Sequence, residues 1–129
     1  MNPTLPEIIT TILNPVFGGR VYDKATPDNL VREGSSPTGR ILDFVVWHKS
    51  GGQDTEFVDQ TMPTKRHARI QLTVFSPSSI AAERALTAAR DALLNSGYTV
   101  GVYGSPVGTY DTARKLQGEF QQFSIWYLQ

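Results

Sequence analysis

The side chains best suited to chemistry in this sequence are two histidines, His48 and His67, and a short basic segment around the second of them. Neither histidine has a second histidine or a carboxylate at a metal-ligand spacing such as His-Glu-x-x-His. The 129 residues contain no cysteine, which excludes disulfides, thiolate metal sites and a cysteine nucleophile. We therefore expect no metal site and interpret the histidines as surface or partly packed side chains.

The sequence lacks the short motifs of serine nucleophiles, phosphate loops and dinucleotide-binding sites. A serine nucleophile on a strand-to-helix elbow needs Gly-x-Ser-x-Gly, whereas residues 104–108 read Gly-Ser-Pro-Val-Gly, which is typical of a turn. The pairs at 18–19 and 51–52 are Gly-Gly, without the Gly-Lys-Ser/Thr ending of a phosphate loop or the spacing of a dinucleotide fingerprint. The ionisable residues form no recognisable catalytic constellation, so no catalytic or cofactor-binding residue is predicted.

The segment 65–69, Lys-Arg-His-Ala-Arg, is the densest positive patch, and acidic residues lie in the loop before it. Opposite charges this close in sequence can complement each other across a boundary between subunits. On a strand edge the same basic residues would guard against aggregation, and nucleic-acid binding is the less favoured alternative. The residues that we predict at an interface are Asp54, Glu56, Phe57, Asp59, Lys65, Arg66 and Arg69.

Composition narrows the class of protein. Lys and Arg total 12, as do Asp and Glu, so the formal net charge is zero, which argues against a dedicated nucleic-acid binder. The longest apolar run, around 44–47, is far too short to span a bilayer, and residues 1–4 show no secretory signal. We expect residues 1–129 to form one soluble, intracellular-type domain.

Hydrophobic periodicity and turn residues predict the order of elements. The predicted elements are a helix over 4–17, a strand over 20–23, a long loop over 24–40, a strand over 41–49, a second long loop over 50–66 with a short ribbon at 55–58, a strand over 67–75, a helix over 77–96, a strand over 98–103, a mostly turn-forming segment over 104–118 with a short strand near 107–110, and a strand over 120–128. This order predicts an α+β fold, a mostly antiparallel four- to five-stranded sheet packed by an N-terminal helix and a longer central helix.

Capping residues mark the helix ends. Thr4 is the predicted N-cap of the first helix, and the glycines at 18–19 end it. Ser76 is the predicted cap of the second helix, with Pro77 at its first position and Gly97 as its left-handed end. The second helix is expected to bury a stripe formed by Ala82, Leu86, Ala89 and Leu93.

The strands differ in how they distribute apolar residues. Strand 67–75 alternates, with Ala68, Ile70, Leu72 and Val74 on one face. Strand 41–49 is apolar on both faces, so it must be covered on both sides by its own helices or by another subunit. In strand 120–128, Phe120 and Phe123 are out of phase, which predicts a bulge near Gln121-Gln122.

An excess of exposed or two-sided apolar and aromatic groups remains. These residues are Phe44, Trp47, Phe57, Phe75, Trp126 and Tyr127. Two interpretations stay open: the second face of the sheet belongs to an assembly, or the two helices together cover the sheet.

Several stretches together resemble one protein family. Residues 45–49 (VVWHK), a glycine-bearing loop and residues 69–76 (RIQLTVFS) leading into an alanine-rich helix resemble the tail completion, or tail terminator, proteins of long-tailed bacteriophages. An opening helix followed by GGRVY at 18–22 and the ending GEFQQFSIWY at 118–127 are also similar to that family. The resemblance covers nearly the whole chain in order and length, and it rests on pattern rather than on a catalytic signature.

The resemblance implies a structural role. Proteins of this kind are small α+β domains that assemble as a ring, typically of six subunits, on the end of a finished tail tube. The ring stops tube growth and offers the docking surface for the head connector or stopper, while DNA passes through its lumen without sequence-specific binding. It implies a location at the head-proximal end of the virion tail, with assembly in the host cytoplasm and an origin in a phage or prophage. No enzyme activity, cofactor or membrane belongs to the family.

Other functions remain open beside this one. The nearest alternative is a head–tail joining or stopper ring protein of the same neck. A small-molecule-binding α+β domain would use His67, Tyr98, Tyr103 and Tyr110 around a pocket. Within the favoured interpretation, loop 50–66 with Lys65, Arg66 and Arg69 is expected at an inter-subunit or tube-facing surface.

Overall fold

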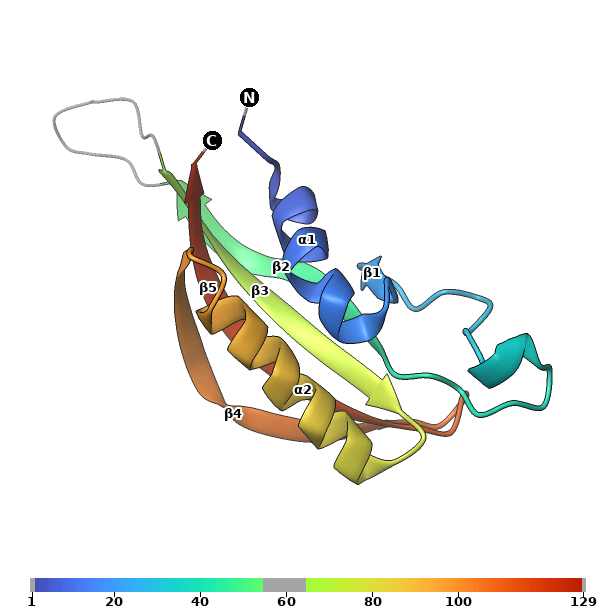
Figure 1. Ribbon diagram of the computed structural model, residues 1–129. Coiled ribbons are helices and arrows are strands. Elements are labelled where there is room, and N and C mark those ends of the chain that lie inside the picture. Colours follow the sequence, from blue (N-terminus) through green and yellow to red (C-terminus); the bar gives the residue numbers. More distant parts are fainter. Residues whose placement is uncertain (1, 55–64, 129) are drawn as a thin grey trace, which may run out of the picture.

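The chain folds into helices packed on a single sheet. The computed structural model describes residues 2–54 and 65–128. Its elements are α1 (Leu5–Phe17), β1 (Val21–Asp23), a 3-10 helix η1 (Glu33–Ser35), β2 (Phe44–Asp54), β3 (Lys65–Ser76), α2 (Ser79–Leu94), β4 (Thr99–Asp111) and β5 (Leu116–Leu128). The strands form one five-stranded sheet in the order β1-β2-β3-β5-β4. Only β1 and β2 are parallel, so the predicted α+β fold with a mostly antiparallel sheet is confirmed (Figure 1).

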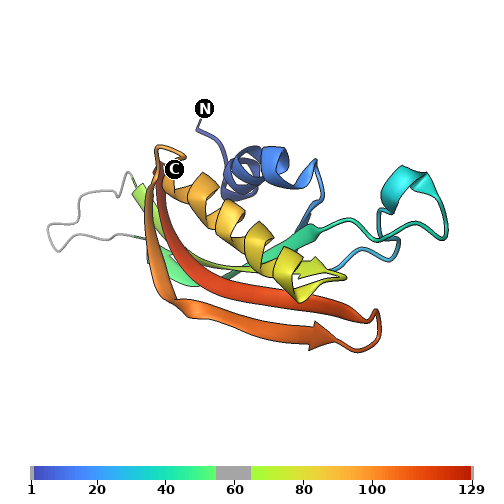
Figure 2. The same ribbon diagram turned by 60° about the horizontal axis from the view of Figure 1, so that its bottom comes forward.

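Both helices lie on the same face of the sheet, and β4 and β5 bend around α2 (Figure 2). The main core lies between the two helices and the sheet. It contains the predicted face of β3, whose four side chains are fully buried, together with Phe123 and Ile125 of β5. From the helices come Ile9 and Leu13 of α1 and three residues of the predicted α2 stripe, Leu86, Ala89 and Leu93. The fourth stripe residue, Ala82, is also buried. Removal of this apolar surface from water supplies the main stabilisation of the fold.

Helix α1 begins and ends at the predicted residues. The Thr4 side chain accepts a hydrogen bond from the Glu7 amide, and the Glu7 carboxylate accepts from the Thr4 amide at 3.1 Å, which forms a capping box. The Thr4 hydroxyl also donates to this carboxylate, at 2.8 Å. The bond from the Thr4 amide first, and the bond from the hydroxyl second, favour the ionised carboxylate and lower the pKa of Glu7. Gly18 ends the helix in the left-handed conformation, with φ 59°.

Helix α2 begins two residues later than predicted. Ser78, not Ser76, is the N-cap, and its side chain accepts from the amide of Ala81. Ser76 is instead the last residue of β3, where it is fully buried and pairs with Gln117 of β5. Pairing in the sheet therefore overrides the local capping signal at Ser76.

Strands β2, β4 and β5 extend well beyond their predicted ends, and β3 extends by two residues at its start and one at its end. Strand β2 starts at Phe44 rather than at 41 and continues through Gly51 and Gly52 to Asp54, with a register shift after Lys49. Strand β4 continues to Asp111, and β5 begins at Leu116, so most of the predicted turn 104–118 is strand. Cross-strand pairing holds these Gly-, Ser- and Pro-containing stretches extended although their composition favours turns.

The predicted bulge at Gln121-Gln122 is wrong. Strand β5 pairs with β3 without any shift from Gln117 to Leu128. The irregularity lies in β4, between Tyr103 and Val107, where Gly104 has a φ of 65°. The Nε2 of Gln121 donates to the Gly104 carbonyl at 2.8 Å. Phe120 is out of phase with Phe123 because it lies on the opposite face of a regular strand.

A second apolar cluster covers the other face of β2. Phe44 and Val46 pack there with Leu116, and the side chains that cover them are Tyr22, Leu30, Ile41 and Phe75. The Phe44 ring stacks on Phe75 at 5.4 Å and meets Tyr22 edge-on at 5.9 Å. The covering residues come from the segment between β1 and β2 and from neighbouring strands, so neither a helix nor another subunit is needed here. The predicted excess of exposed apolar groups is smaller than expected, because this cluster buries Phe44 and the main core buries Trp47 and Tyr127.

Replacement of the α1 cap tests this account of the helix start. We expect Thr4→Ala to lower the free energy of unfolding by about 1 kcal/mol, because the Glu7 amide loses its acceptor. The Thr4 hydroxyl also donates to the Glu7 carboxylate and helps to lower its pKa in the folded state, so the stability from this bond exists at neutral pH and is lost as the pH falls through that pKa. The difference between the two proteins should therefore become smaller in acid without vanishing, because the bond from the Glu7 amide to the Thr4 side chain does not involve the carboxylate. Urea unfolding at neutral and acidic pH measures both effects, with Thr11→Ala, an exposed position within α1, as the control. An equal loss in the control would contradict the capping role.

Candidate interaction surfaces

The face of the sheet opposite the helices carries polar and aromatic side chains beyond the second cluster. On β3 these are His67, Arg69, Gln71 and Thr73, which alternate with the buried residues. The His67 ring stacks on Trp126 of β5, with ring centroids 4.6 Å apart. The guanidinium carbon of Arg69 lies 4.4 Å from the ring centroid of Tyr103 on β4, a cation–π contact. We call the patch formed by His67, Arg69, Tyr103 and Trp126 the outer patch.

The guanidinium of Arg69 lowers the pKa of Tyr103 in the outer patch. Arg69 first, and Ser124 second, favour the phenolate and so lower the pKa of Tyr103, while partial desolvation opposes them. The arginine thus both contacts the tyrosine ring and stabilises its ionised form. This coupling ties β3 to β4 across β5, although the two strands do not pair directly.

The structure separates the basic residues that the sequence groups together. Arg69 is exposed in the outer patch, whereas Arg66 lies on the helix-bearing face beside Tyr127, its register partner on β5. Strand β3 is paired with β2 on one side and β5 on the other, so these residues do not guard a sheet edge. Arg66 and Arg69 lie on opposite faces because side chains alternate along a strand and both residues belong to β3. The sequence does not predict this split, because the composition of residues 50–66 favours a loop.

The other predicted interface residues are placed only in part. Lys65 begins β3 opposite Leu128, and Asp54 ends β2 opposite Arg66. Glu56, Phe57 and Asp59, together with the predicted ribbon at 55–58, lie outside the described residues. The predicted interface therefore remains a proposal.

Two open sheet edges were missed by the sequence analysis. Within the described residues, β4 pairs only with β5, and β2 is covered by β1 only at Val45, Val46 and Trp47. Strand β4 bears large apolar side chains that are 38% to 49% exposed, namely Val102, Tyr103, Val107 and Tyr110. The sequence signal was the alternation around Val107 and Thr109, which the neighbouring Gly, Ser and Pro obscured.

Of the residues suggested for a small-molecule site, the structure brings only His67 and Tyr103 onto the outer patch, without Tyr98. Tyr98 packs against the main core beside the helices, while His67 and Tyr103 lie on the opposite face. His48 lies on β2 opposite Gln71. Over 2–54 and 65–128 the structure contains no group of three or more His, Asp and Glu residues able to hold a metal ion. In the same ranges no helix is long and apolar enough to cross a membrane.

Among known proteins, this chain has matches in structure but not in sequence. No protein-family model matches the sequence, and no curated protein matches it. The fold is similar to that of a chain in a structure described as the virion of a native gene transfer agent (GTA) particle, with a TM-score of 0.56. The two chains are 15% identical, and the match covers 91% of this chain and 84% of the other. At this identity the similarity shows a shared fold.

Proposed function

We propose that this protein is a structural subunit of a phage-like virion. The observation that carries the proposal is the shared fold with a chain of the gene transfer agent virion, which extends over 91% of this chain. The features described above fit a protein that works by contact with other proteins. They are two open sheet edges, an exposed apolar strand and an outer patch of stacked aromatic and basic groups.

Within such a particle, the role that we propose is that of the tail terminator. A ring of copies, typically six, would cap the end of the tail tube, stop its growth and offer the surface that joins the head connector or stopper. Support comes from the resemblance of residues 45–49, 69–76 and 118–127 to that family. A net charge of zero suits a lumen through which DNA slides, because few phosphates would be neutralised.

The sheet edges suggest how a ring would close. A ring needs two unlike surfaces that meet head to tail, and β4 and the 48–54 half of β2 are unlike open edges at opposite sides of the sheet. Successive antiparallel pairs make β2 and β4 run in opposite directions. A rotation about an axis nearly parallel to the strands would therefore bring β4 antiparallel to β2 of the next copy, the commoner arrangement of paired strands.

The first test is assembly. We expect light scattering over a wide concentration range to detect a discrete closed oligomer that is ring-shaped in negative stain, or a monomer that forms a ring on one end of purified tail tubes. Binding to the head connector but not to the tube would favour the stopper role instead. A protein that stays monomeric and binds neither would contradict the virion proposal.

The β4 edge has its own test. We expect Val107→Lys to weaken subunit association at least about tenfold, because a charge would replace an apolar contact at the centre of the edge. Val107 is 49% exposed, so the variant should keep its fold and melting temperature. Ile80→Lys, at a 63% exposed position on α2, is the matched control. Ring formation by Val107→Lys at wild-type concentrations would remove β4 from the interface.

Charge reversal tests the predicted interface residues. We expect Arg69→Glu or Arg66→Glu to block ring formation or tail joining, and because the two lie on opposite faces, the effective variant identifies the face in contact. Arg90→Glu, at an exposed position of α2, serves as the control and should assemble normally. If both reversed variants assemble and join tails, the predicted surface is wrong.

A further inference from the structure

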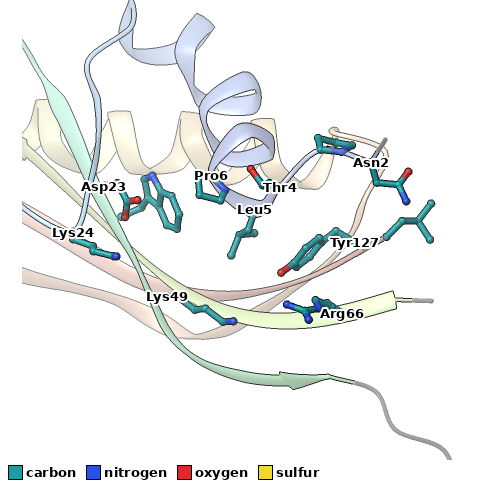
Figure 3. A pocket seen from close by; sticks show the side chains of 12 residues that line it. Asn2, Thr4, Leu5, Pro6, Asp23, Lys24, Lys49, Arg66 and Tyr127 are labelled. Atoms are coloured by element: carbon teal, nitrogen blue, oxygen red, sulfur yellow. The ribbon is translucent and has the colours of Figure 1, made fainter. Parts of the chain in front are cut away.

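A cavity of about 500 Å³ lies beneath the start of α1, between that helix and the sheet (Figure 3). One wall is apolar and is formed by Leu5 and Pro6 of α1 and Trp47 of β2. Leu5 and Trp47 are themselves buried, at 6% and 3% exposure, so this wall belongs to the core and is held in place. The cavity is on the helix-bearing face and is therefore separate from the outer patch.

The opposite wall is positively charged. Lys24, which follows β1, Lys49 of β2 and Arg66 of β3 line the cavity, against a single carboxylate, that of Asp23. In Figure 3 the Lys49 and Arg66 side chains extend toward each other along the floor of the cavity. Arg66 already has an interaction of its own, so the argument depends on the two lysines, both exposed, and uses Arg66 only for its charge.

A buried tyrosine adds a hydrogen-bond donor. Tyr127 is 8% exposed and belongs to the main core, but its hydroxyl is directed into the cavity near Arg66 (Figure 3). A phenol oriented by the core can donate a hydrogen bond to an acceptor that a ligand supplies.

The α1 amides do not supply the recognition. The capping box already uses the amides of Thr4 and Glu7, and Pro6 has no amide hydrogen. A phosphate held at a helix N-terminus would need such amides. Side-chain ammonium groups and a phenol beside an apolar wall are better matched to a carboxylate carried next to an apolar group.

We propose that this cavity binds an acidic segment of a partner protein, with a side-chain carboxylate held by Lys24, Lys49 and Tyr127 and a neighbouring apolar side chain against Leu5 and Trp47. Charge complementarity selects this partner, since the lining carries three cations and one carboxylate. The inference concerns the single subunit and does not depend on ring assembly, so either proposal can fail without the other.

The test uses Trp47 as a reporter within the cavity. The probe is the blocked peptide acetyl-Ala-Glu-Phe-Ala-amide, and the same peptide with Gln in place of Glu is its neutral control. We expect the Glu peptide to change tryptophan emission saturably and to bind at least about tenfold more tightly than the Gln peptide. The same change should persist in Trp126→Phe, which removes the other tryptophan, on the far face. No saturation up to about 10 mM, or equal binding of the two peptides, would overturn the proposal.

Variants assign the contacts. Lys49→Gln and Lys24→Gln should each weaken binding of the Glu peptide several-fold and leave the melting temperature unchanged, because both side chains are exposed. Tyr127→Phe keeps the buried ring and should weaken binding through loss of the hydroxyl alone. Lys115→Gln, on the exposed turn between β4 and β5, should bind as wild type does. Wild-type binding by all three cavity variants, or full displacement of the peptide by inorganic phosphate, would contradict a carboxylate site.

Discussion

Every other part of the structure depends on the position of β3 at the centre of the sheet. This strand pairs with β5 without interruption from Lys65 to Ser76 and with β2 over nearly the same length. Its alternate side chains, Ala68, Ile70, Leu72 and Val74, are fully buried under both helices. A shift of one residue would expose all four and bury Arg69 and Gln71, so the register of β3 is strongly fixed. The register in turn fixes which basic residue faces which side.

The two faces of the sheet consequently have different chemistry. On the helix-bearing face, the core ends at a cavity where Lys49, Arg66 and the Tyr127 hydroxyl meet an apolar wall. On the other face, an aromatic cluster around Phe44 covers one end, and stacked and cation–π pairs lie over the rest. The open edges of β2 and β4 separate the two faces. The fold thus offers several distinct surfaces, which the proposed role in an assembly would require.

The helices and the core could be predicted from the sequence because their signals are local. Thr4, Glu7 and Gly18 act within one or two turns, and the stripe of α2 follows from helical periodicity alone. The ends of the strands could not be predicted, because Gly51, Gly104 and Ser76 adopt conformations set by partners far away in the chain. The position of the candidate site residues could not be predicted for the same reason, because it depends on pairing between strands distant in the sequence. Spacing placed Arg66 and Arg69 in one patch, and only the unbroken pairing of β3 shows that they lie on opposite faces.

The strand order also determines how the chain must fold. The pairs β2–β3 and β4–β5 join strands that are neighbours in the sequence, whereas the central pair β3–β5 joins Lys65 to Leu128, and α2 and β4 come between the two strands. Sequence-local hairpins form quickly, but a contact that closes a long loop loses chain entropy before any packing compensates for it. Docking of β5 against β3 therefore carries a large loop-closure cost, because α2 and β4 lie between the two strands in the sequence. An undocked β3 or β5 has an unpaired edge, and an unpaired strand edge is a template for pairing with another copy of the chain.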